Sequence, residues 1–82
     1  MLTTAVQSTT LATVAYDATG QVLWLEFRSH AVYRYFGVPA AVHRDLLDAN
    51  SKGNYFNRRI RHCFPYQRVA SLPLTQLPAT VS

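Results

Sequence analysis

The stretch QVLWLEFRSHAVYRYF, residues 21–36, decides the fold. Its side chains alternate between two faces over residues 21–28 and again over residues 31–36, which is the period of β-strands. One face of the first segment carries three apolar side chains, Leu23, Leu25 and Phe27. Because only Ser29 and His30 separate the two segments, the sequence predicts two antiparallel strands joined as a hairpin.

A third strand is predicted upstream, over residues 11–16, which are rich in residues that favour strands. Residues 17–20 predict a turn, since Asp17 can bond its own backbone and Gly20 can adopt a positive φ. Three strands joined by short turns form an antiparallel meander.

Two helices are predicted downstream. Pro39 suits a first helical turn, and apolar side chains at helical spacing predict an amphipathic helix over residues 39–49, closed by Asn50 in a left-handed cap. Ser51 is the predicted N-cap of a second helix, which runs from about residue 53 to residue 62. Its buried stripe is Phe56, Ile60 and Phe64. The predicted fold is α+β, a three-stranded antiparallel β-meander followed by two α-helices packed on one face.

The length of 82 residues allows one domain. We expect a flexible N-terminal lead over residues 1–10, the domain over residues 11–69, and a flexible Pro-containing tail over residues 71–82 that is either a terminal extension or a segment that docks on a partner. No apolar run approaches about 18 residues, and no secretory signal is visible, so we expect a cytoplasmic protein without a membrane partner.

Charge is distributed unevenly along the chain. The net charge is +4. Residues 1–50 carry three Arg against four acidic residues, a sum of −1, whereas residues 51–82 carry five cations and no acid. Such an unbalanced segment attracts phosphates, and a Tyr among the cations can stack on a base. The candidate nucleic-acid-binding residues are Lys52, Tyr55, Arg58, Arg59, Arg61 and Arg68. The alternative is a solvated polar face that keeps a small protein soluble.

Two further surfaces follow from the strand pattern. Tyr33 and Tyr35 share one face, where they form either part of the core, which we favour, or a platform for stacking bases. Trp24, Arg34 and Phe36 lie on the opposite face. If helices cover only one side of the sheet, this opposite face is partly exposed, and it predicts an alternative function as a protein-interaction adaptor or a homodimerising module.

No constellation for catalysis is present. His62 and Cys63 are adjacent on the predicted helix, so their side chains diverge by about 100° and cannot act as a pair. We interpret Cys63 as a small buried residue and place His43 at a helix flank. The three His fall on separate elements, which gives no metal-ligand spacing. We therefore expect a non-enzyme without catalytic residues, metal or cofactor.

Together these motifs resemble the KTSC domain, which is named for a C-terminal extension of some bacterial lysyl-tRNA synthetases and also occurs as a small stand-alone bacterial or phage protein. The matching residues lie between about 12 and 69. They include Val14 to Asp17, the strand Leu23 to Phe27, Tyr33 to Tyr35, Val38-Pro39, Ser51 to Gly53, Tyr55 to Asn57 and Ile60-Arg61. The family has no established function, and the resemblance suggests binding to nucleic acid, RNA especially. His30 departs from the pattern, since the family often has Gly there.

Overall fold

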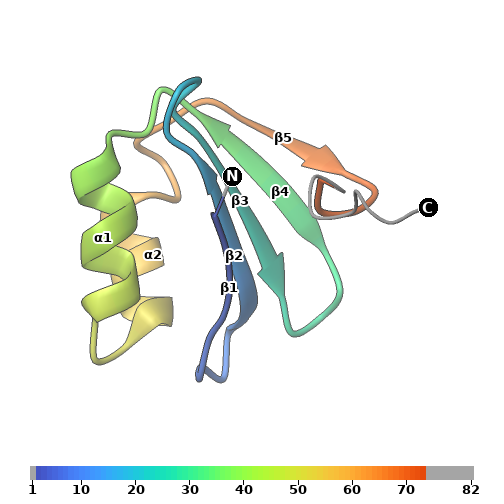
Figure 1. Cartoon of the computed structure of the whole chain (residues 1–82). Coiled ribbons are helices and arrows are strands. Elements are labelled where there is room, and N and C mark those ends of the chain that lie inside the picture. Colours follow the sequence, from blue (N-terminus) through green and yellow to red (C-terminus); the bar gives the residue numbers. More distant parts are fainter. Residues whose placement is uncertain (1, 74–82) are drawn as a thin grey trace.

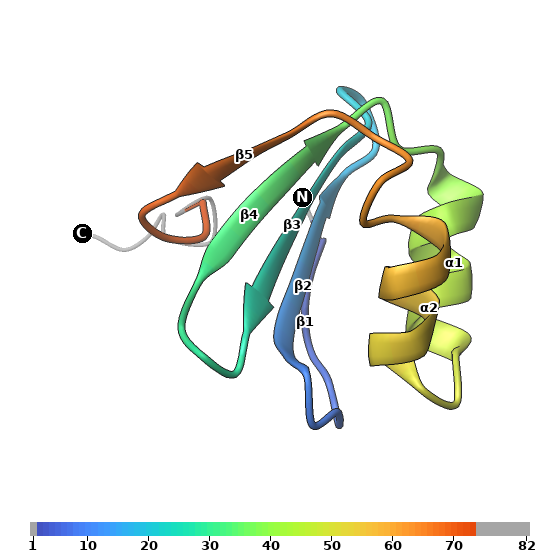
Figure 2. The ribbon, with the colours of Figure 1, turned by 180° about the vertical axis from the view of Figure 1, so that it is seen from behind.

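The computed structural model describes residues 2–73, which form a five-stranded antiparallel sheet and two helices (Figure 1). The strand order in the sheet is the order in the chain. The elements are β1 (Leu2–Ala5), β2 (Leu11–Asp17), β3 (Val22–Phe27), β4 (Val32–Phe36), α1 (Ala40–Asp48), α2 (Lys52–Arg59) and β5 (Tyr66–Val69). Both helices lie on one side of the sheet, as the view from behind also shows (Figure 2).

The α+β class is confirmed, but the number of strands is wrong, since the sheet has five strands where three were predicted. β1 lies in the segment expected to be a flexible lead, and it pairs with β2 from Leu2 opposite Tyr16 to Ala5 opposite Thr13. β5 follows Pro65 and pairs with β4. Both added strands are four-residue edge strands with few buried side chains, so their own sequences carry little apolar alternation.

The helices are shorter than predicted. The backbone N–H of Asn54 donates to Ser51 Oγ at 3.3 Å, which confirms Ser51 as the N-cap of α2. The helix ends at Arg59 rather than near residue 62, because the N–H groups of Ile60 and Arg61 both donate to the carbonyl of Phe56 and close the last turn. Arg61 and the residues after it therefore leave the helix and belong to the connection toward β5.

Positive φ values fall on other residues than those predicted. Asp17 Oδ1 accepts from the Thr19 N–H at 3.1 Å as expected, but Gln21 rather than Gly20 adopts the left-handed conformation. α1 ends on Ala49 in an extended conformation, without a left-handed Asn50. In the β3–β4 turn the His30 N–H donates to Phe27 and His30 itself has φ 76°, the geometry of a three-residue hairpin loop with a left-handed last residue.

The core lies between the helices and the sheet. Phe56 and Ile60 of the predicted α2 stripe are buried there, and Phe64 packs against its border. The side chains that are wholly buried are Leu11, Val14, Leu23, Leu25, Val38, Leu46 and Ile60. This set confirms that the apolar face of residues 23–27 is the face that receives the helices.

His43 is part of this core and not a flank residue. Its ring is 7% exposed and stacks on the ring of Tyr16, with centroids 4.6 Å apart and an interplanar angle of 14°. The Tyr16 hydroxyl donates to the carbonyl of Val38 at the start of the helical half. His43 Nε2 is buried without a hydrogen-bond partner, and burial lowers the pKa of His43.

At Gly53 the first turn of α2 lies close to Thr10, the residue before β2. A Cβ added to Gly53 would lie 2.5 Å from Thr10 Oγ1 and 3.2 Å from Thr10 Cβ. Since real side chains do not approach so closely, only Gly allows the first turn of α2 to lie against the start of β2.

We expect Gly53→Ala to lower the free energy of unfolding by about 1–2 kcal/mol, because the overlap with Thr10 outweighs the helix-forming advantage of Ala. Urea denaturation measures the change. Asn57→Ala, at an exposed position of the same helix, is the matched control and should be neutral or stabilising. Adding Thr10→Ala should restore part of the loss. A Gly53→Ala protein more stable than wild type would contradict the close contact.

We also expect stability to fall as the pH falls below 6.5. The lowered pKa of His43 in the folded protein means that the unfolded chain binds more protons in this range, so acid favours unfolding. His43→Phe should reduce this pH dependence, since the carboxylates contribute equally to both proteins. Urea denaturation of both proteins at several pH values is the measurement, and identical pH profiles would contradict the prediction.

Candidate nucleic-acid interface

The five cations of the second half lie on α2, on the connection after it and on β5. Four of them, Arg58, Arg59, Arg61 and Arg68, are exposed. Lys52 is half-buried and donates from Nζ to the carbonyl of Ala49 at 3.1 Å, so it closes the helix junction. Among residues 2–73 the one ion pair joins Arg44 to Asp45 on α1, so no acidic side chain there neutralises the four arginines.

Four of the six predicted site residues line two hollows, while Lys52 lines a third hollow beside the β1–β2 connection. The first lies at the α1–α2 junction, has a volume of about 340 Å³ and contains Tyr55, Arg58 and Arg59. Burial raises the pKa of Tyr55; Asp45 acts in the same direction, and Arg59 opposes it. An acidic side chain of α1 therefore lies close to this hollow and weakens its attraction for phosphates.

The second hollow, here called the aromatic groove, has a volume of about 390 Å³ and lies between the sheet and the end of α2. Tyr35 and Phe56 form its buried base, and Phe27 and Tyr33 are half-buried at its sides. Arg61 and His62 border it from the connection after α2, and Tyr66 borders it from β5. Of the six candidate nucleic-acid-binding residues only Arg61 lines it, together with Tyr33 and Tyr35 of the possible stacking platform.

The rings of the groove contact one another in series. Tyr66 lies 5.7 Å from Tyr35 and 5.8 Å from Tyr33 between ring centroids, and Phe27 meets Tyr33 edge-on at 6.0 Å. Tyr66 is nevertheless 59% exposed. Tyr35 is therefore a core residue, as we favoured for the tyrosine pair. Tyr33 is half-exposed beside Tyr66, so the alternative of a stacking platform stays open for Tyr33.

Charge reaches the groove through Arg61. Burial raises the pKa of Tyr35 to about 12; Tyr33 and Tyr66 add to this, and Arg61 opposes it. Tyr35 therefore keeps its proton at neutral pH, and the guanidinium of Arg61 lies close enough to act on the same ring system.

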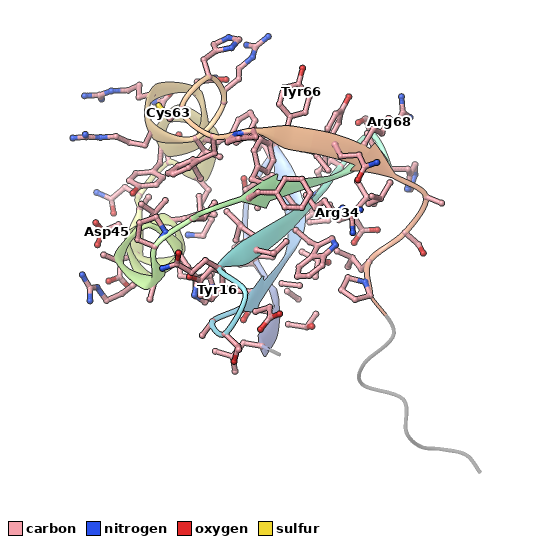
Figure 3. The ribbon with its side chains drawn as sticks, turned by 90° about the horizontal axis from the view of Figure 1, so that it is seen from above. Tyr16, Arg34, Asp45, Cys63, Tyr66 and Arg68 are labelled. Carbon is pink, nitrogen blue, oxygen red and sulfur yellow. The ribbon has the colours of Figure 1, made fainter. Side chains whose placement is uncertain are left out.

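Strand pairing explains why these residues meet. β5 places Tyr66 opposite Tyr35 and Arg68 opposite Tyr33, on the face of the sheet that carries the core. The helices do not extend over β5 (Figures 1 and 2), so this part of the core face stays open. Figure 3 shows Tyr66 and Arg68 along β5, with Asp45 away from them on α1. Sequence reasoning missed Tyr66, because its place beside Tyr35 depends on the pairing of β5 with β4.

The opposite face of the sheet carries the predicted partner surface. Arg34 donates to Gln67 Oε1 from Nε at 2.9 Å and also from Nη2, and its guanidinium lies 5.3 Å from the ring centroid of Phe36. Arg34 therefore stabilises the β4–β5 pair. Trp24 and Phe36 are half-buried, while Val32 of the same strand as Phe36 is buried.

Cys63, metal-binding groups, membrane-spanning helices and the C-terminal tail were also subjects of the sequence predictions. Cys63 is exposed rather than buried, because the helix ends before it. Residues 2–73 hold no group of three His, Cys, Asp or Glu side chains placed to bind a metal ion. No helix in the same range is long and apolar enough to cross a membrane. Residues 74–82 of the predicted tail lie outside the described part of the chain.

Known proteins with a similar sequence or structure were found. A KTSC domain protein from Yersinia pestis has a crystal structure that matches with a TM-score of 0.80 and 29% sequence identity, over 83% of this chain and 96% of that one. An uncharacterized protein of Stutzerimonas stutzeri is 46% identical over 54 residues, which are 66% of this chain and 76% of that protein.

Longer relatives are also found. A lysine–tRNA ligase of Trichormus variabilis is 44% identical over 55 residues, which are 67% of this chain and 10% of the ligase. The match thus spans about a tenth of the ligase. The KTSC domain pattern itself matches residues 7–64, most of the chain and all of its central elements from β2 to α2. The chain therefore belongs to the KTSC domain family.

Proposed function

We propose that this KTSC domain binds single-stranded nucleic acid, RNA in particular, through its basic surface, defined as Arg58, Arg59, Arg61 and Arg68. The observation that carries the proposal is that these four arginines are exposed and have no acidic partner among residues 2–73. Like charges without acidic partners cost a small domain stability, and a bound polyanion removes that cost.

The chemistry of the surface suits phosphates and bases together. Guanidinium groups contact phosphate oxygens in pairs, and Tyr66 and Tyr33 offer rings between Arg61 and Arg68. Alternation of cations with exposed aromatic rings is typical of surfaces that bind single strands, where bases are free to stack. The lysine–tRNA ligases among the relatives supply the reason for preferring RNA, since their name says that they act on tRNA.

The first prediction concerns salt. If about four phosphates are contacted, log affinity falls with log salt at a slope near −3, so binding weakens roughly 50-fold between about 50 mM and about 200 mM salt. Fluorescence anisotropy of labelled single-stranded RNA, single-stranded DNA and duplex probes is the measurement. The double variant Arg58→Ala/Arg59→Ala should make the slope shallower by about 1.4, since two phosphate contacts are lost.

Arg44→Ala is the matched control, because Arg44 is an equally exposed arginine but is paired with Asp45 on α1. It should leave affinity and slope nearly unchanged. An affinity that does not respond to salt, or the absence of binding to every probe at low salt by a folded protein, would rule the proposal out.

A second candidate function is self-association through the sheet face opposite the helices. It is favoured by Trp24 and Phe36, two large aromatic side chains that stay partly exposed on a face that no helix covers. Arg34, held by Gln67, supports this surface rather than contacting a partner freely.

For this candidate we expect a dimer in sedimentation equilibrium that Trp24→Ala weakens at least tenfold, since a central aromatic side chain carries about 2 kcal/mol or more of interface energy. Leu2→Ala removes an exposed apolar side chain at the sheet edge and should leave the dimer intact. A protein that stays monomeric at high concentration would exclude this function.

A further inference from the structure

We propose that the aromatic groove receives one unstacked base of the bound strand, with the base on the ring of Tyr66 and the phosphates on either side held by Arg61 and Arg68. This proposal rests on the proposed function and adds to it. The basic surface alone explains attraction to a polyanion, whereas the groove gives the domain a means of contacting the bases themselves.

Burial distinguishes the parts of the groove. Tyr35 and Phe56 are buried and packed in the core, so they form a fixed base for the groove. Phe27 and Tyr33 are half-buried at its sides. The volume of about 390 Å³ is at the lower end of the range of about 300–1,000 Å³ in which proteins hold small organic ligands. A planar group with the size of a nucleobase fits such a space better than an extended peptide does.

Tyr66 is the residue of the groove that is exposed enough to stack on a base. Among the Phe, Tyr and Trp residues of 2–73 it is the only exposed one, with 59% of its surface accessible, although it lies beside the rings of Tyr33 and Tyr35. The rings of Tyr33 and Tyr35 contact part of the Tyr66 side chain and restrict it, and the exposed part is accessible to a base. A ring that is already fixed loses little conformational freedom when a base stacks on it.

The charges around the groove fit a base that is joined to a phosphate chain. Arg61 borders the groove from the α2 side, and Arg68 lies on β5 opposite Tyr33. None of the residues that line the groove is acidic. A single strand that crosses from the α2 connection to β5 would therefore meet a cation, an aromatic ring and a second cation. These groups are complementary to the phosphate, base and phosphate that the strand presents.

The test compares two strands of equal charge. The probes are an oligouridylate of about ten nucleotides and an abasic strand of the same length, both labelled for fluorescence anisotropy. We expect the full protein to bind the oligouridylate roughly 5- to 150-fold more tightly, the range that corresponds to one stacked base. Tyr66→Ala should abolish that preference and leave binding to the abasic strand unchanged.

Two variants separate stacking from structure. Tyr66→Phe keeps the ring and should keep the preference, whereas Tyr66→Leu keeps an apolar side chain against Tyr33 and Tyr35 but removes the ring and should lose it. Circular dichroism of each variant verifies the fold. A preference for bases that survives both Tyr66→Ala and Tyr66→Leu would place the base elsewhere and overturn the assignment.

The remaining outcomes also decide between the two proposals. Equal, salt-dependent binding of the two strands would overturn the base-binding groove and leave the phosphate-binding function standing. Absence of binding to both strands would overturn both proposals. Uridine monophosphate is the last probe. If it binds as tightly as the oligouridylate with the same dependence on Tyr66, the groove is a site for free nucleotides and the role assigned to the strand is wrong.

Discussion

Helices of nine and eight residues cannot cover a sheet of five strands. The uncovered part of the core face and the open face opposite the helices both follow from this difference in size. The apolar stripe of α2 reaches its place over the sheet because Gly53 lets the first turn approach Thr10 closely. The core side of β5 lies beyond the helices. One face of the sheet is therefore a closed core over β2 and β3 and an open aromatic surface toward β5.

Charge is separated along the same direction. The acidic residues Asp45 and Asp48 belong to α1, while the four arginines of the basic surface lie on α2 and beyond it. Tyr55 is within the influence of Asp45, whereas the ring system around Tyr35 is within the influence of Arg61. Between the hollow at Tyr55 and the aromatic groove, the groove thus has the more favourable surroundings for an anion. This is the physical reason for placing the base there and not at Tyr55.

Much of the fold could be predicted because its central elements carry strong local signals. Alternation predicts β3 and β4, and Ser51 predicts the start of α2 correctly. β1 and β5 escaped because an edge strand of four residues needs only one partner and little apolar surface. The site was predictable only in its charges. Arg58, Arg59, Arg61 and Arg68 follow from counting, but Tyr66 joins them solely through strand pairing, which a local pattern does not contain.

The left-handed backbone at His30 has a consequence for how this domain can diversify. Its neighbours Ser29 and Ala31 both line the aromatic groove, so the turn forms one lip of the opening. The carbonyl and amide bonds that close this turn fix the lip through main-chain geometry. This lip is therefore independent of the side chains that line the rest of the groove. Substitutions at Tyr33 or Tyr66 can change the rings of the groove while the turn keeps its main-chain geometry, so the turn is a fixed border beside a lining that is free to vary.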